Sequence, residues 1–167
     1  KLVEDHRMNL DSVGSEVELQ ISGMPMGIGE PWFDGIEPYL ARAMMSIPAA
    51  RGVEFGEGFA AIEMKGSEHN NPWGGSKDNP VMLGEKPDGA LAGLSTGSDF
   101  FCKVAFKPPS SIPQEQVTLN LATNEQEPLT VKGRHDPVLA PRAGAVVEAM
   151  AKFAVADLAL RGGFYSE

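Results

Sequence analysis

The chain has 167 residues, a length typical of one domain, and such a chain buries about 70% of its unfolded surface. Hydrophobic residues make up 42% and charged residues 22%, a balance that excludes a disordered chain. The formal net charge of −9 would repel a phosphate backbone, so we expect no nucleic-acid binding. We therefore predict a single folded domain, residues 1–167.

Cysteine and histidine usage narrows the classes further. Cys102 is the single cysteine, which excludes an internal disulfide and a cysteine metal cluster and fits a reducing cytoplasm. His6, His69 and His135 lie far apart without ligand spacing, so no metal site is expected. No stretch reaches the ~18 apolar residues of a membrane span, and no signal-peptide pattern opens the sequence. We expect a cytoplasmic protein that does not bind membranes.

The first elements in chain order are a strand, a loop and a helix. Polar and apolar residues alternate over 15–22, which predicts a half-buried antiparallel strand. The glycine-rich segment 23–35 predicts a loop, and within it Asp34 is a candidate N-cap for a helix that ends near Ile47. The residues expected on the buried face of this helix are Ile36, Leu40, Ala43, Met44 and Ile47.

The middle of the chain is less regular. Residues 51–56 indicate a short strand. Residues 58–66 leave strand and helix open, and the spacing of Phe59 and Ile62 favours helix. Residues 66–88 are polar and rich in turn residues, which predicts a long loop of the kind that is usually functional or mobile.

Two hairpins are expected next. In residues 89–106, small residues form a first strand and 95–99 form the turn. The second strand should present one apolar face, made of Phe100, Cys102, Val104 and Phe106. Residues 115–131 alternate again, and the segment 123–128 would connect to a returning strand. The apolar side of the first of these strands would hold Val117, Leu119 and Leu121.

The last element is a helix from about Arg142 to Arg161. Pro141 suits its first turn and Gly162 its C-terminal cap. Antiparallel strands together with a few helices predict the α+β class.

A charged cluster, Arg134, His135 and Asp136, stands before this helix. Because Pro137 disfavours the helical region for the residue before it, the cluster should be extended, with Arg134 and Asp136 on one side and His135 on the other. An arginine fork suits a phosphate or carboxylate, and its charge favours an ionised Asp136 that could accept a proton. The alternative is an ordinary ion pair at a strand-to-helix junction, which this stretch alone favours.

The segment KPPSS, residues 107–111, has two readings as well. Its prolines offer no N–H, so a backbone anion site would have to begin at Ser110, with Lys107 supplying charge. The alternative is a strand that ends at a proline pair, and this is favoured for the segment by itself.

Taken together, several long motifs in order resemble the chorismate synthase family, over nearly the whole chain from about Asp11. These motifs are DSVGSEVE (11–18), GIGEPWFDGIEPYLARAMMSIPAARGVEFGEGF (27–59), KGSEHN (65–70), KPPSS (107–111) and GRHDPVLAPRAGAVVEAM (133–150). Members of the family are considerably longer, and nothing here resembles their N-terminal half with its catalytic histidines and arginines. We interpret the chain as a C-terminal portion.

The resemblance implies a fold and a reaction. The family fold is a β-α-β sandwich, with helices between two antiparallel sheets, of which this portion would supply about half. The implied activity is that of a carbon-oxygen lyase: 5-enolpyruvylshikimate 3-phosphate loses phosphate and a ring proton in a 1,4-elimination that gives chorismate, in the shikimate pathway of aromatic amino acid biosynthesis. The family requires reduced FMN (FMNH2), and its members are homotetramers.

The resemblance also implies site residues. Asp136 matches the aspartate thought to take a proton from the flavin, and Arg134 matches an anion contact. The position of an expected glycine falls on Ala92, with Gly93 beside it. The residues that match flavin contacts are Pro48, Ala49, Ala92, Lys107, Pro108, Pro109, Ser110, Ser111 and Arg134. His135 stands where the family varies.

Two alternatives stay open. Because the substrate-clamping cations of the other half are not in this sequence, the chain alone is expected to be inactive, and it could instead be a non-catalytic FMN-binding or assembly module. Some family members also reduce flavin with NAD(P)H, and no feature of the sequence decides this for the present chain.

Overall fold

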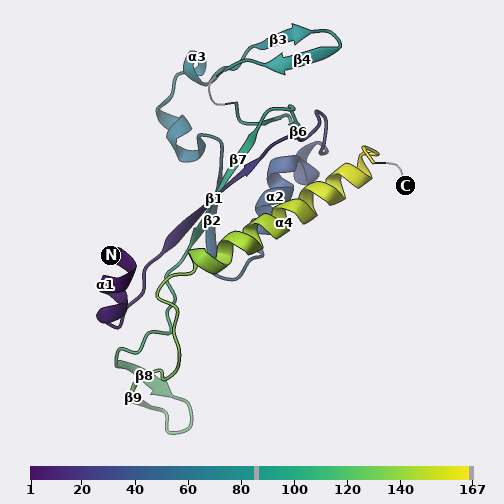
Figure 1. Ribbon diagram of the computed structural model, residues 1–167. Coiled ribbons are helices and arrows are strands. Elements are labelled where there is room, and N and C mark those ends of the chain that lie inside the picture. Colours follow the sequence, from purple (N-terminus) through teal and green to yellow (C-terminus); the bar gives the residue numbers. More distant parts are fainter. Residues whose placement is uncertain (85–86, 166–167) are drawn as a thin grey trace.

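The computed structural model describes residues 1–84 and 87–165. Its body is an antiparallel sheet in the strand order β1–β7–β2, with α2 and α4 packed on one face (Figure 1). The sheet strands are β1 Ser15–Ile21, β2 Ala50–Phe55 and β7 Phe100–Phe106, and the helices are α2 Ile36–Met45 and α4 Ala140–Arg161. This arrangement confirms the predicted α+β class, the strands near 15–22 and 51–56, and the last helix.

The central strand β7 carries the core. Its inward side chains are Phe100, Cys102, Val104 and Phe106, each at most 4% exposed, as the alternation predicts. A buried phenylalanine contributes about 1.5–3 kcal/mol relative to an exposed one. Helix α2 covers this face with Ile36, Leu40 and Met44, all fully buried, and α4 covers it with a row of small and apolar residues.

The start of α2 differs from the prediction. Its N-cap is Gly35, without a side-chain cap bond, and Asp34 lies in the 3-10 turn η1 Trp32–Asp34. The Asp34 carboxylate instead accepts a bond from Arg161 at 2.9 Å and lies 3.9 Å from Arg42. Because these two arginines come from α4 and α2, Asp34 joins the two helices and is not free to cap one of them.

The predicted hairpin of residues 89–106 is wrong in its pairing. The short strands β5 Ala90–Leu91 and β6 Leu94–Ser95 pair with each other, and β7 pairs with β1 and β2. The reason is a two-residue turn, because Ala92 and Gly93 both have positive φ, +53° and +89°. Two consecutive left-handed residues are typical of a tight hairpin turn.

Residues 66–88 are not one long loop. They contain a helical turn, α3 Gly66–His69, and a hairpin of β3 Trp73–Ser76 and β4 Asn79–Met82, with glycine at positions 74 and 75. Residues 85–86 of the predicted loop lie outside the described residues. Before this arm, η2 Gly58–Glu63 bears out the helical reading of 58–66.

Two arms project from opposite ends of the body (Figure 1). One is the β3–β4 hairpin with α3, and the other is a hairpin of β8 Gln116–Asn120 and β9 Glu125–Leu129. The predicted alternation in β8 does not produce a buried face, because Val117, Leu119 and Leu121 are 66%, 50% and 88% exposed. A short helix, α1 Leu2–Met8, precedes the sheet. Among the described residues, no helix could span a membrane.

Candidate functional site

The KPPSS segment lies beside the turn that follows α2. The backbone N–H of Lys107 donates to the carbonyl of Ala49 at 3.0 Å. Ala50 in turn donates to Ile47 at 3.1 Å, which closes a turn with Pro48 and Ala49 at its centre. Ala49 has φ +70°, a conformation that favours glycine at this place in a turn. Two motifs predicted to share a site, 48–49 and 107–111, are therefore in direct contact.

Residues 12–13 join the KPPSS segment to the charged cluster. The hydroxyl of Ser12 donates to the carbonyl of Pro109 at 2.6 Å, and the N–H of Val13 donates to the carbonyl of Pro137 at 2.9 Å. We call this region the junction site: residues 12–15, 48–49, 107–113 and 133–137. A hollow of about 200 Å³ opens within it, lined among others by Ser12, Ile112 and Asp136.

Within the charged cluster, Asp136 forms an ion pair, as the alternative to a catalytic cluster predicted. Its partner is an arginine from outside the cluster. Oδ2 of Asp136 lies 2.8 Å from Nη1 of Arg142, in the first turn of α4. His135 lines the same hollow as Asp136, and its Nε2 lies 3.2 Å from the carbonyl oxygen of Val131. Arg134 does not line this hollow. The expected alternation fails because the segment before α4 is irregular and not a strand.

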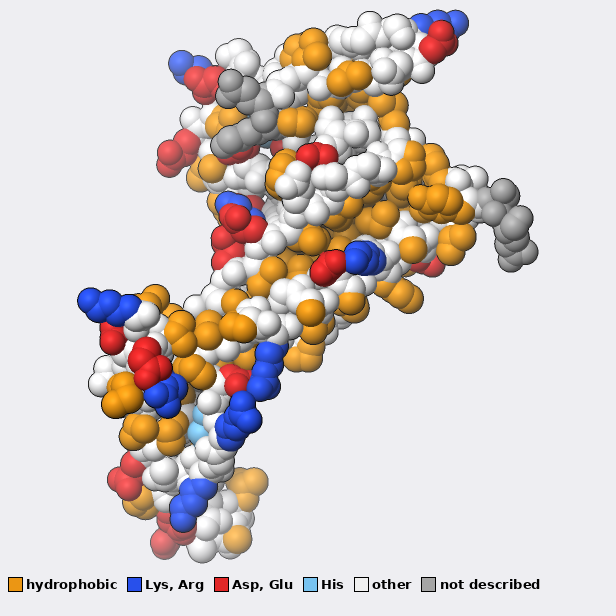
Figure 2. All heavy atoms as spheres, in the orientation of Figure 1, with side chains coloured by type: hydrophobic (Ala, Val, Ile, Leu, Met, Phe, Trp, Pro, Cys, Tyr) orange, Lys and Arg blue, Asp and Glu red, His pale blue; other side chains and the backbone are white. Residues whose placement is uncertain are grey.

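The junction site gathers positive charge on an acidic chain. Lys107 and Arg134 are exposed, and within residues 1–84 and 87–165 neither has an ion-pair partner. Figure 2 shows Lys and Arg side chains gathered beside the segment that leads into α4. Exposed cations fit a phosphate-bearing, anionic group such as FMN.

Sequence reasoning missed Ser12, a residue of the junction site, and Arg142, which lies in α4 and pairs with Asp136 of that site. Ser12 lies in the DSVGSEVE motif, so its place in the motif was the available signal. Arg142 lies at the start of the predicted helix, and only the chain's path shows that its guanidinium reaches Asp136.

Ala92 is the predicted flavin contact that the fold does not bring to the junction site. It lies in the β5–β6 turn, where the N–H of Ile36 donates to the carbonyl of Gly93 at 2.9 Å. This places Ala92 at the N-terminal end of α2, whereas Ala49 follows its C-terminal end. Ten helical residues separate the two positions by about 15 Å.

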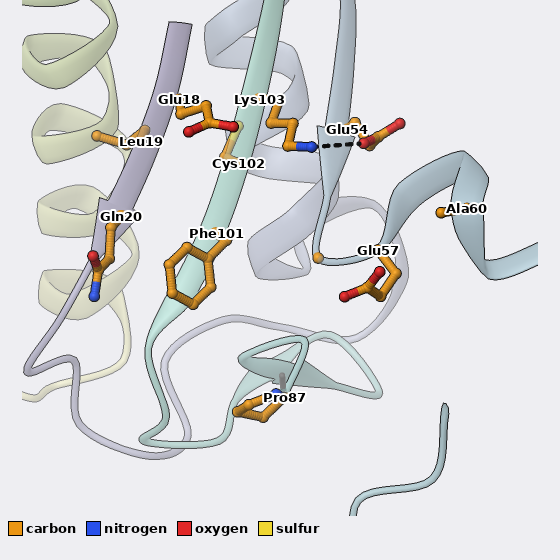
Figure 3. A pocket seen from close by; sticks show the side chains of 11 residues that line it. Glu18, Leu19, Gln20, Glu54, Glu57, Ala60, Pro87, Phe101, Cys102 and Lys103 are labelled. Carbon is orange, nitrogen blue, oxygen red and sulfur yellow. Dashed lines mark ion pairs between the residues drawn. The ribbon is translucent and has the colours of Figure 1, made fainter. Parts of the chain in front are cut away.

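A larger hollow, of about 540 Å³, lies on the sheet face opposite the helices (Figure 3). Glu18, Glu54 and Lys103 line it on three neighbouring strands, and Nζ of Lys103 lies 3.7 Å from Oε1 of Glu54. None of the predicted site residues lines this hollow. Its size therefore does not make it the candidate for the predicted chemistry.

The chain is similar to proteins of one family. Curated relatives named chorismate synthase include those of Methanosarcina acetivorans, 44% identical over 158 residues (95% of this chain, 43% of the relative), and Korarchaeum cryptofilum, 47% identical over 161 residues (95% and 44%). A crystal structure of chorismate synthase superimposes with a TM-score of 0.76 and 26% identity, over 96% of this chain and 41% of that one. The chain thus spans less than half the length of these relatives. The family model described as chorismate synthase matches residues 1–160, so the chain belongs to the chorismate synthase family.

Proposed function

We propose that the chain forms part of the active site of a chorismate synthase, a lyase that converts 5-enolpyruvylshikimate 3-phosphate to chorismate with reduced FMN. The junction site is the observation that carries this proposal. It joins three separate motifs, 48–49, 107–111 and 133–137, through backbone and side-chain bonds. Among the residues that the structure describes, it also leaves Lys107 and Arg134 without an ion-pair partner, on a chain of net charge −9.

In this proposal each group has a role that follows from its chemistry. Lys107 and Arg134 would attract and orient anionic groups, of which the substrate and FMN both carry several. The hydroxyls of Ser110 and Ser111, both exposed, would donate to phosphate or ring oxygens. Pro48, Pro108 and Pro109 would hold the backbone rigid around a bound ring, since proline fixes φ.

Asp136 is the group that would handle a proton. Its carboxylate is two-thirds buried and is held by Arg142, which fixes its orientation toward the hollow. Reduced FMN, when bound, supplies electron density that assists departure of the phosphate and accepts the hydrogen lost from the ring. Asp136 would accept a proton from the bound flavin. Arg142 would stabilise the ionised carboxylate of Asp136 until that transfer.

A chimera tests the role of Asp136. In it, the chain replaces the matched region of the Methanosarcina acetivorans chorismate synthase, so that the remainder of a family member is present. Asp136→Asn should retain FMN binding and reduce turnover by about 10²–10⁴-fold. Asp99→Asn is the matched control, since Asp99 lies on a loop away from the junction site and accepts a hydrogen bond from Gln20 of β1. Undiminished turnover of Asp136→Asn would contradict the assignment.

A second function fits one particular observation. Ala92 lies at the other end of α2 from the junction site, so the single chain does not bring all the proposed flavin contacts together. The chain alone would then be an inactive FMN-binding or assembly module. Titration of the 167-residue chain with FMN, with and without 5-enolpyruvylshikimate 3-phosphate, separates the two. A higher affinity for FMN in the presence of the substrate would favour an active site within this chain.

The segment 66–88 is proposed to order over bound flavin. Within it, the arm of residues 66–84 projects from the end of the body away from the junction site (Figure 1), so it would cover flavin held by another copy of the chain in an assembly. An ion pair lies within this segment, with Nε2 of His69 3.5 Å from Oδ2 of Asp88. Limited proteolysis of the chimera measures this directly, with cleavage in the arm expected to slow when FMN is added. Equal cleavage rates with and without FMN would count against the proposal.

A further inference from the structure

Strand β1 is a regular strand at the edge of the sheet. It pairs with β7 in unbroken register over all seven residues, from Ser15 opposite Phe106 to Ile21 opposite Phe100. Among the described residues no second strand lies on its other side. An edge strand of this length presents a row of free backbone N–H and carbonyl groups, which is a template for another strand.

A groove runs along this edge, between β1 and α4. It has a volume of about 600 Å³, and Figure 3 shows Leu19 pointing from β1 toward α4. The apolar residues that line the groove are Val17, Leu19, Ile21, Val147, Ala151, Val155 and Ala159. The three from β1 are only partly buried, whereas the facing residues of the central strand β7 are at most 4% exposed. The core is thus unfinished on the β1 side.

The opposite edge of the sheet does not offer the same template. Strand β2 has a register shift between Ala50 and Gly52, where it pairs with β7. A bulge of this kind bends an edge strand and interrupts its row of backbone groups. Of the two edges, β1 is therefore the one suited to accept a further strand.

A second copy of β1 would be a poor occupant. On the face away from the helices, β1 presents Glu16, Glu18 and Gln20. Antiparallel pairing of two β1 strands would bring the glutamates of both copies close together, and like charges directly opposite each other are destabilising. A strand with basic or neutral polar residues on that face, and apolar residues toward the groove, would be complementary.

We propose that the β1 edge and its groove bind an extended segment of the polypeptide that longer family members carry beyond the matched region. More than half of each relative's length lies outside that region, because the match covers 43% of the Methanosarcina acetivorans protein and 44% of the Korarchaeum cryptofilum protein. The segment adds a strand to the sheet, places alternate apolar side chains in the groove, and sets basic or neutral side chains opposite Glu16 and Glu18. This rests on family membership and not on the flavin chemistry.

Hydrogen exchange of the β1 amides tests the proposal, with the isolated chain compared with the chimera described above. A new strand should slow exchange of the outward-facing amides of β1 by about tenfold or more, while the amides at the β2 edge stay unchanged. A second form of the experiment co-expresses this chain with the unmatched region of the Methanosarcina acetivorans protein as a separate polypeptide. This form still gives a measurement if the chimera folds poorly. Equal exchange at β1 in the isolated chain and in the assembled forms would overturn the proposal. So would failure of both forms to assemble.

Two variants test whether the protection of β1 depends on its edge and groove, and a third, distant variant controls for general effects of substitution. Val155→Glu puts a charge into the groove and should abolish the added protection of β1, because the buried carboxylate would have no partner. Glu18→Lys reverses the charge that would face the added strand and should reduce the protection, while the apolar lining of the groove stays the same. Leu121→Glu, at an 88% exposed position on the distant hairpin, is the control and should leave protection intact. Protection of β1 that grows with concentration of the isolated chain would identify a second copy as the occupant and refute the proposal.

Discussion

The two helices of the body cover the same sheet in different ways. Helix α2 buries one stripe, Ile36, Leu40 and Met44, and leaves Arg42 exposed. Helix α4 is apolar on more than one side. It buries Val147 and Leu158 against the sheet, and it also exposes apolar residues on the side facing away: Val146 (44%), Phe153 (73%) and Leu160 (61%).

This difference indicates that α2 completes its packing within the chain and α4 does not. A helix with apolar residues on all sides is normally enclosed by other elements. In a sandwich with helices between two sheets, the outer side of α4 would face the second half of the fold. Figure 2 shows hydrophobic side chains gathered over α4, in keeping with a surface that lacks its cover.

The largest expected effect comes from truncating matched positions on the two helices. Leu40→Ala removes a fully buried side chain and should lower the free energy of unfolding by about 2–5 kcal/mol, because it leaves a cavity. Phe153→Ala in α4 should change it by no more than about 0.5 kcal/mol in the isolated chain. Urea unfolding of both variants measures the contrast. Similar losses would show that Phe153 already has a packing partner.

A charge on the outer side of α4 should change self-association more than stability. Phe153→Glu interrupts the exposed apolar stripe, so the isolated chain should stay monomeric at concentrations where the parent chain associates. Light scattering coupled to gel filtration measures the mass of both. Glu148→Gln is a suitable comparison, since it changes charge on the same helix without touching the stripe. Identical association of Phe153→Glu and the parent would mean that another surface drives it.

A smaller effect is expected from the polar link between the helices. The Tyr39 hydroxyl donates to the Asp157 carboxylate, and the guanidinium of Arg42 lies 4.4 Å from the centre of the Tyr39 ring. Tyr39→Phe keeps the ring and removes the donor, so it should cost about 1 kcal/mol of unfolding free energy. Tyr165→Phe, at an exposed position, serves as the control in the same urea experiment. A loss no larger than the control's would mean that the bond adds nothing to helix packing.

Local pattern was sufficient to predict the elements of the body. Alternation over 15–22 and 100–106 predicted two strands and the inward faces correctly, and helical spacing placed Ile36, Leu40 and Met44 in the core. These predictions succeed because one buried face imposes a period on the sequence. The contact of the KPPSS segment with residues 48–49 was expected from the family's motifs alone.

Pairing and partner choice were not predictable in the same way. The hairpin of residues 89–106 was wrong because the positive φ of Ala92 is not evident from an alanine. Asp34 was expected to cap α2, but two arginines from different helices compete for its carboxylate. The alternation of β8 predicted a buried face that has no cover among the described residues. In each case the deciding contact is distant in sequence.

The two helices also differ in how pH should act on one glutamate of each. In α2, burial raises the pKa of Glu37, and the charge of Asp88 raises it further, whereas in α4 the hydrogen bond from Lys152 lowers the pKa of Glu148. Above the ordinary glutamate pKa of about 4.3, folded Glu37 still holds a proton that the unfolded chain has released, so its contribution to stability falls as pH rises. Glu148 contributes in the opposite sense, since its stabilisation is present above that pH and is lost as pH falls.

Urea midpoints between pH 4 and pH 7 should therefore show Glu37→Gln gaining stability relative to the parent toward pH 7. Glu148→Gln should lose stability relative to the parent over the same range. A Glu37→Gln difference that is constant with pH would mean that the carboxyl is solvated, and that α2 is less enclosed than its apolar stripe indicates.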